Sequence, residues 1–137
     1  MIRFHYRYRA MRVRKAGQVR FWLLEVAKRE DKAIASIDYI FVDDPTLLEI
    51  NRQNLQHDYF TDIITFPYQS RPIKGEIYIS VDRVREHAQE YGVSFDHELH
   101  RVMVHGLLHL CGYDDTSKRK KQRMTEKEDF YLDLLND

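Results

Sequence analysis

Apolar residues alternate with polar ones at the start of the chain and then recur at helical spacing. Residues 2–8 alternate strictly, which predicts a half-buried strand. Over 19–27 the apolar residues return every three or four positions, as on the buried face of a helix. The segment 34–42 is rich in β-branched and aromatic residues and predicts a buried strand.

The middle of the chain predicts one more helix and two more strands. The segment 44–51 has helical spacing, and Asp44 suits its N-cap. The segment 61–66 predicts a strand that Pro67 stops, because proline cannot donate a hydrogen bond to a neighbouring strand. After a turn, 75–79 predicts the fourth strand.

Serine and glycine residues mark the ends of the remaining helices. Ser80 suits the N-cap of a helix that Gly92 ends, and Ser94 suits the N-cap of the next. That helix is predicted to end in a left-handed turn at Gly112, and Thr116 begins a final helix. About four short strands and five helices in mixed order predict an α+β or α/β layered domain. We favour α+β, with a mixed sheet packed against the helices.

The composition indicates a globular protein. The chain has 137 residues, of which 43% are hydrophobic and 12% aromatic, and this length suits one domain, 1–137. The longest apolar runs are four or five residues, against about 20 for a membrane span. The first residues also lack the apolar core of a signal peptide. The single cysteine, Cys111, excludes an internal disulfide and fits a reducing compartment. We therefore expect a soluble cytoplasmic protein with no membrane partner.

The charges cancel in total but are separated along the chain. There are 22 basic and 22 acidic side chains, so the formal net charge is zero. Residues 1–20 nevertheless hold seven basic side chains and no acidic one, and 118–123 hold a second basic cluster. The members of the second cluster are Lys118, Arg119, Lys120, Lys121 and Arg123. Because a partner feels the local field within about 8 Å, the two patches are compatible with phosphate binding. The alternative interpretation is a solvated charged face.

Two histidines and an aspartate have the spacing of metal ligands. His105 and His109 stand at i, i+4 within a predicted helix, so both imidazoles can reach one ion. Asp115 follows six residues after the second histidine, beyond a glycine turn, and has Asp114 beside it. Two imidazoles and one carboxylate form an open three-ligand set with room for water. The alternative is that the two aspartates cap the final helix, a role that Thr116 and Ser117 can also fill.

Three sequence blocks resemble the YbeY family. Residues 104–114, Val-His-Gly-Leu-Leu-His-Leu-Cys-Gly-Tyr-Asp, resemble the family signature His-Gly-x-Leu-His-Leu-x-Gly-Tyr-Asp-His. Residues 61–67, Thr-Asp-Ile-Ile-Thr-Phe-Pro, resemble its Thr-Asp-Val-Leu-Ser-Phe-Pro block. Residues 75–80, Gly-Glu-Ile-Tyr-Ile-Ser, are similar to its Gly-Asp-Ile strand. The order and spacing of these blocks cover most of the chain from about residue 37 onward.

The resemblance implies a metal-dependent endoribonuclease specific for single-stranded RNA. It implies a role in rRNA processing, at the 3′ end of 16S rRNA, and in ribosome quality control, with rRNA and the small ribosomal subunit as partners. The implied cofactor is one divalent ion, zinc in the first place, held by His105, His109 and Asp115. A second hypothesis is a non-catalytic rRNA-binding assembly factor with a structural metal site. A third, weaker hypothesis is a hydrolase of a small phosphoester or amide.

Two positions depart from the family pattern. The third ligand is a histidine in the family and Asp115 here, which keeps a metal donor but adds a negative charge. Many members also have an arginine six residues before the threonine of the Thr-Asp block, where this chain has Leu55. A phosphate-steadying role therefore cannot be carried over to that position.

The residues around the ligands favour phosphodiester chemistry. Gly106 stands where zinc peptidases of the His-Glu-x-x-His type have their general base, which argues against proteolysis. A divalent ion can lower the pKa of a bound water and polarise a phosphoryl oxygen, and Asp114 could orient a ligand or the water. His57 and Asp62 would lie near the ion in a family-like fold, but we favour loop and strand-end roles for them. We expect Cys111 to be a small buried apolar group rather than a ligand.

Overall fold

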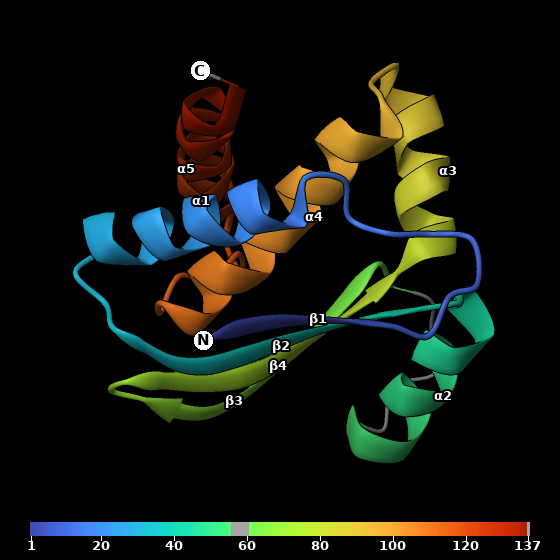
Figure 1. Ribbon diagram of the computed structural model, residues 1–137, viewed down its shortest axis with the longest axis horizontal. Coiled ribbons are helices and arrows are strands. Elements are labelled where there is room, and N and C mark those ends of the chain that lie inside the picture. Colours follow the sequence, from blue (N-terminus) through green and yellow to red (C-terminus); the bar gives the residue numbers. More distant parts are fainter. Residues whose placement is uncertain (56–60, 137) are drawn as a thin grey trace.

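The computed structural model describes residues 1–55 and 61–136. Within these residues, four strands and five helices form a mixed sheet with helices on both faces (Figure 1). The strands are β1 (Ile2–Tyr6), β2 (Ile34–Val42), β3 (Ile63–Ser70) and β4 (Ile73–Ser80). The helices are α1 (Ala16–Arg29), α2 (Asp44–Leu55), α3 (Val81–Tyr91), α4 (Phe95–Leu110) and α5 (Lys118–Asn136). The predicted α+β class is confirmed.

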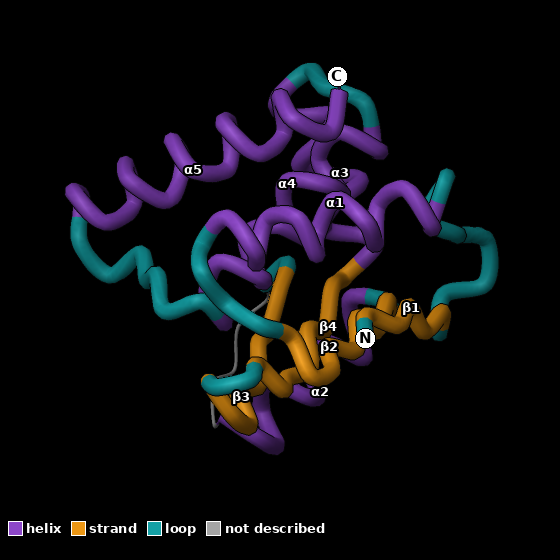
Figure 2. The backbone as a smooth tube through the Cα atoms, turned by 60° about the vertical axis from the view of Figure 1, so that its left-hand side comes forward, coloured by secondary structure: helices purple, strands orange, loops and turns teal. Residues whose placement is uncertain are grey.

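The sheet has the strand order β1-β2-β4-β3. β1, β2 and β4 run parallel, and β3 pairs antiparallel with β4 at the edge. The larger hydrophobic core lies between one face of the sheet and helices α1, α3, α4 and α5, whereas α2 covers part of the opposite face (Figures 1 and 2). Along β2, Tyr39 and Phe41 face the larger core, and Ile40 and Val42 face α2 with Leu47.

Helix α4 lies in the middle of the larger core and carries the two histidines. Its apolar side chains are buried against the sheet, and the buried Tyr39 hydroxyl donates to the carbonyl of Met103 at 2.8 Å. On the other side, α1 and α5 are joined by Trp22, whose indole N–H donates to the carbonyl of Tyr131 at 2.7 Å. The ligand-bearing helix is therefore fixed by neighbours on several sides.

The serine caps are confirmed at both predicted helices. The side chain of Ser80 accepts from the backbone N–H of Arg83 at 3.2 Å, and Ser94 accepts from that of His97 at 3.1 Å. Gly92 ends α3 in a left-handed conformation, with φ of 66°.

Three predicted element ends were wrong. β3 does not stop at Pro67 but continues to Ser70, because the proline lies at a register shift on an edge strand, where its missing N–H is tolerated. The N-cap of α2 is Asp43 rather than Asp44, because the Asp43 carboxylate accepts from the backbone N–H of Thr46 at 2.9 Å.

The third misplaced end is the start of α5. Of the two possible caps Thr116 and Ser117, the second caps this helix, because the Ser117 hydroxyl accepts from the backbone N–H of Lys120 at 3.1 Å. The helix therefore begins two residues later than predicted, at Lys118. The extra residues lengthen the loop that carries Asp114 and Asp115.

Gly106 lies where α4 packs tightly against the sheet. A Cβ atom at this position would lie 2.9 Å from Cδ1 of Ile63 and 3.0 Å from Cγ2 of Ile77. Such contacts are too close for a real Cβ atom, so a larger residue here would force these isoleucine side chains or the helix to shift. The glycine between the two histidines thus has a packing cause.

We expect Gly106→Ala to lower the free energy of unfolding by up to about 2 kcal/mol. Overpacking costs about 1–3 kcal/mol and opposes the gain of about 1 kcal/mol in helix propensity. Urea denaturation measures the difference. The matched control is Gly17→Ala in α1, where a Cβ would meet nothing within 4 Å, and this variant should be as stable as the wild type or more so. A Gly106→Ala protein as stable as the control would contradict the packing argument.

Candidate metal centre

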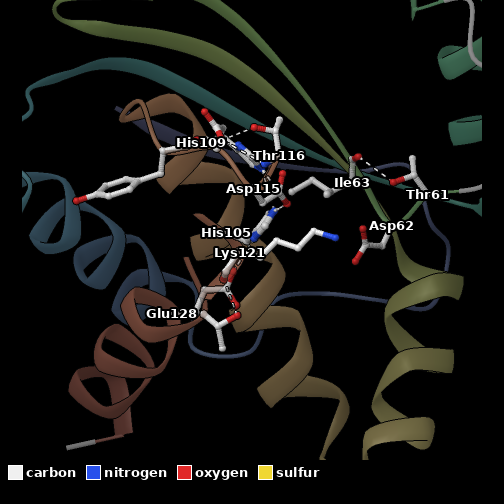
Figure 3. A network of polar contacts seen from close by, with 12 residues as sticks. Thr61, Asp62, Ile63, His105, His109, Asp115, Thr116, Lys121 and Glu128 are labelled. Atoms are coloured by element: carbon white, nitrogen blue, oxygen red, sulfur yellow. Dashed lines mark hydrogen bonds and ion pairs between the residues drawn. The ribbon is translucent and has the colours of Figure 1, made fainter. Parts of the chain in front are cut away.

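The three predicted ligands converge on one point. His105 and His109 project from α4, and their Nε2 atoms lie 2.9 Å apart (Figure 3). One carboxylate oxygen of Asp115, from the loop after the helix, lies 3.7 Å from Nε2 of His105 and 3.9 Å from Nε2 of His109. Among residues 1–55 and 61–136, these three form the group whose His, Cys or carboxylate atoms are close enough to hold one ion.

The separations suit a small divalent ion. Metal–ligand bonds of about 2.0–2.1 Å in a tetrahedron give ligand–ligand edges of about 3.3 Å, which the observed separations of 2.9–3.9 Å bracket. Two imidazole nitrogens and one carboxylate oxygen are a donor set that zinc and related metals accept. His105, His109 and Asp115 would therefore hold such an ion and leave a coordination position for another group.

The outer nitrogen of each imidazole has a hydrogen-bond acceptor. Nδ1 of His105 lies 2.5 Å from a carboxylate oxygen of Glu128, and Nδ1 of His109 lies 2.9 Å from the carbonyl of Tyr113. Both partners can only accept, so both Nδ1 atoms must donate. In the neutral tautomer, Nε2 then keeps its lone pair and points into the cluster. This arrangement is characteristic of histidines that bind metals.

Glu128 was not among the predicted site residues. The structure buries it between α5 and α4. Arg101 donates to Glu128 at 2.8 Å and to Asp129 at 2.6 Å. A signal was present in the sequence, because Glu128 stands at helical spacing between the buried Met124 and Tyr131. A carboxylate within an apolar stripe needs a partner, and here His105 and Arg101 provide it.

The two histidines differ in proton affinity. Burial alone would lower the pKa of His105, but the hydrogen bond and charge of Glu128 outweigh burial and raise it above its ordinary value. Burial lowers the pKa of His109, and the neighbouring His105 lowers it further. Because an imidazole must be neutral to bind a metal, protons compete with the ion chiefly at His105.

The two adjacent aspartates have different partners in the structure. Asp115 faces the histidines, whereas Asp114 accepts from the backbone N–H of Thr116 at 3.2 Å and from its hydroxyl at 2.9 Å. The amine of Lys120 also lies 3.2 Å from the Asp114 carboxylate. Asp114 therefore shapes the turn before α5 without capping that helix, which Ser117 caps, and Asp115 is the residue placed to bind an ion.

A buried carboxylate, that of Glu30, contacts the loop between α4 and α5, which carries Asp115. Glu30, after the C-terminal end of α1, accepts from the Tyr113 hydroxyl at 2.6 Å and from the Lys127 amine at 3.0 Å, and the Tyr131 hydroxyl also donates to it. Burial opposes ionisation of Glu30, but these donors outweigh burial and lower its pKa. Tyr113 stands two residues before Asp115, so the network limits movement of the loop that carries the third ligand.

A cavity of about 350 Å³ opens beside the cluster, between α3, α4 and α5. His105 and Asp115 form part of its wall, and most of its other ionisable residues belong to the three helices. Beyond those two ligands, the ionisable side chains of the wall include Asp62, His87, Glu98, Arg101, Lys121 and Glu128. The cluster is therefore accessible to a ligand from outside.

The position of Asp62 differs from the interpretation that we favoured. Asp62 lies just before β3 but lines the cavity, with a carboxylate oxygen 3.6 Å from Nδ1 of His87. His57, which we grouped with it, lies outside the described residues. On the same wall, burial raises the pKa of Glu98.

Cys111 is buried and free, as expected for a small apolar residue. Burial raises the pKa of its thiol to about 11, and the thiol is not part of the ligand cluster. Leu55, at the position of the family arginine, is the last residue of α2 and is exposed.

The basic residues of the N-terminal region are partly engaged within the protein. The Arg3 guanidinium donates to Asp38 at 2.7 Å, and that of Arg14 lies 3.0 Å from Asp96.

None of the helices in 1–55 and 61–136 combines the length and apolar character needed to cross a membrane.

The fold and the cluster together define an α+β protein with a candidate three-ligand metal site on a buried helix. The family model described as "Endoribonuclease YbeY" matches residues 7–136. The chain belongs to the YbeY family, which confirms the resemblance seen in its motifs.

Proteins of known sequence and structure agree with this assignment. The chain is 45% identical to the Endoribonuclease YbeY of Flavobacterium psychrophilum over 137 residues, which cover 99% of this chain and 97% of the relative. It is 47% identical to that of Bacteroides thetaiotaomicron over 108 residues, 78% of this chain and 79% of the relative. The solution structure of TM1509 from Thermotoga maritima superposes with a TM-score of 0.71 at 30% identity, over 98% of this chain and 89% of the other.

Proposed function

We propose that this protein is an endoribonuclease that cleaves single-stranded RNA with the help of a divalent ion held by His105, His109 and Asp115. The observation that carries the proposal is the convergence of these side chains at the wall of an open cavity, in a member of the YbeY family. We propose zinc as the ion, because two imidazoles and a carboxylate suit it.

We propose rRNA in the small ribosomal subunit as the substrate, with cleavage in 3′-end maturation of 16S rRNA and a role in ribosome quality control. The family membership supports this substrate class, since the relatives carry the name endoribonuclease. The basic residues of 118–123 follow directly after the ligand loop, where they can hold phosphates that flank the cleaved bond.

The side chains of the cavity suit hydrolysis of a phosphodiester. When bound, a divalent ion supplies a Lewis acid that activates water and polarises a phosphoryl oxygen. Glu128 and the Tyr113 carbonyl hold the two imidazoles with Nε2 turned inward. Glu98 and His87 line the same cavity and can exchange a proton with a bound substrate.

The second candidate is a non-catalytic rRNA-binding factor with a structural ion. A structural zinc site is closed by four protein ligands. Within the described parts of the chain the cluster has three ligands and borders a cavity, which favours the enzyme.

Cleavage of a labelled oligoribonucleotide tests the proposal. Protein stripped of metal with a chelator and reloaded with Zn²⁺, Mn²⁺ or Mg²⁺ is given the single strand or the same strand annealed to its complement. We expect internal cleavage of the single strand with at least one ion, at least about 10-fold slower cleavage of the duplex, and no cleavage by the stripped protein. RNA binding without cleavage under every ion would instead support the structural role. Cleavage of a small phosphodiester at a rate that ignores salt would support the third hypothesis.

A further inference from the structure

One face of α5 forms a wall of the cavity beside the metal ligands. Lys121, Thr125 and Glu128 stand at i, i+4 and i+7 on this face, and all three line the cavity. Glu128 at one end holds His105. Lys121 stands seven residues before it, about 10 Å along the helix axis, at the rise of 1.5 Å per residue. Figure 3 shows the Lys121 side chain pointing toward the part of the wall where Asp62 lies.

The other basic residues of 118–123 do not line this cavity. Lys120 is bound to Asp114, and the guanidinium of Arg123 lies over the ring of Tyr113, 5.6 Å from its centre. Lys118 and Arg119 are exposed at the start of the helix. The cluster that looks uniform in the sequence is therefore divided, and Lys121 is the member that faces the proposed site.

The cavity wall carries more acidic than basic side chains, and Lys121 is one of its few cations. Four carboxylates line the cavity, and the guanidinium of Arg101 is already bonded to Glu128 and Asp129. Within residues 1–55 and 61–136, the side-chain ammonium of Lys121 makes no ion pair or hydrogen bond, although its backbone carbonyl accepts from the Thr125 hydroxyl. The four carboxylates are Asp62, Glu98, Asp115 and Glu128.

We propose that Lys121 binds a non-bridging oxygen of the phosphate that enters this cavity, whereas the rest of the basic cluster contacts RNA only outside it. The proposal rests on the proposed function, because it assigns a phosphate-binding residue to that site. A phosphodiester is an anion that the carboxylates of the wall repel. The proposed ion offsets this repulsion beside its ligands, and the ammonium of Lys121 offsets it on the side of the wall where Asp62 lies. Negative charge grows on the phosphoryl oxygens as the bond breaks, so the ammonium should favour the transition state more than the bound substrate.

Exchange of Lys121 for methionine tests the proposal, because methionine keeps the length of the side chain and removes its charge. We expect Lys121→Met to lower kcat/KM on the single-stranded oligoribonucleotide by about 100-fold, with part of the loss in kcat. Lys121→Arg should recover most of the activity. Metal-free protein in chelator should bind the same oligonucleotide about 10-fold more weakly after Lys121→Met. Metal content and the unfolding midpoint should be unchanged.

Two further variants separate a local from a general charge effect. Arg119→Met removes one charge from the same helix outside the cavity, where it can contact only a flanking phosphate, and should lower kcat/KM by about threefold at most, through KM and with kcat unchanged. Lys28→Met removes an exposed charge on α1 and should change neither cleavage nor binding.

The outcomes distinguish this proposal from the proposed function. If the wild type cleaves RNA and Lys121→Met behaves like Arg119→Met in both assays, the role of Lys121 is overturned and the endoribonuclease stands. If the wild type binds RNA but cleaves none, the proposed function fails, and the binding difference alone decides the role of Lys121. If the wild type neither binds nor cleaves RNA, both are overturned.

Discussion

Exchange of His109 for alanine is expected to abolish stoichiometric binding of a divalent ion and, with it, RNA cleavage. His109 supplies one of three converging ligand atoms, and its Nε2 lies 2.9 Å from that of His105. Loss of a group that only supports a ligand costs about 10–100-fold in metal affinity, so loss of a ligand should exceed 100-fold. Metal content after dialysis, together with competition against a chromogenic chelator, measures the change.

Three further variants make this test specific. His97→Ala removes another histidine of α4, near its first turn and outside the cluster, and should keep one ion per chain. Asp115→Ala should lose the ion as His109→Ala does, whereas Asp114→Ala should keep it, because Asp114 is bonded to Thr116 and Lys120. Full metal occupancy in His109→Ala and Asp115→Ala would overturn the ligand assignment.

The second large effect is expected at Glu128, which is not a ligand. Glu128→Gln keeps the size of the side chain and an acceptor for Nδ1 of His105 but removes the negative charge. We expect metal affinity to fall by about 10–100-fold, because the carboxylate orients His105 and makes its Nε2 a stronger donor. The measurement belongs at pH 8, well above the ordinary histidine pKa of about 6.5, so that protons compete little in either protein.

Asp129→Asn is the matched control for this variant. Asp129 is the next residue of α5 and accepts from the same Arg101, at 2.6 Å, but it is exposed and does not contact His105. Its replacement should leave metal affinity within about twofold of the wild type, because screened surface pairs contribute little. Equal losses in the two variants would mean that the Arg101 pairing, rather than the His105 contact, controls the site.

Much of the secondary structure could be predicted from local pattern. Ser80 and Ser94 cap the helices that their positions predicted, and β2 has the predicted bounds, 34–42. These features depend on residues a few positions apart, which periodicity and capping chemistry describe well. Pro67 was misjudged because its effect depends on which strand lies beside it, and β3 turned out to be an edge strand.

Part of the site could also be predicted. The helical spacing of His105 and His109 was enough to place both on one face, and the structure confirms that they lie close together with Asp115. The choice between Asp114 and Asp115 was left open. It depends on how the loop turns between α4 and α5, which the contacts of Tyr113 with Glu30 help to determine.

By itself, the sequence determined the α+β class, the two histidines on one helical face, and motifs specific enough to indicate the family. Only the tertiary structure decided which distant groups meet those histidines and the cavity beside them. Glu128 stands 23 residues from His105, and Glu30 stands 83 residues from Tyr113. Helical periodicity predicts which residues share a face of a helix, but not which element packs against that face. The packing of the sheet and helices decides this, so the roles of Glu128, Glu30 and the cavity-facing Lys121 could be seen only in the fold.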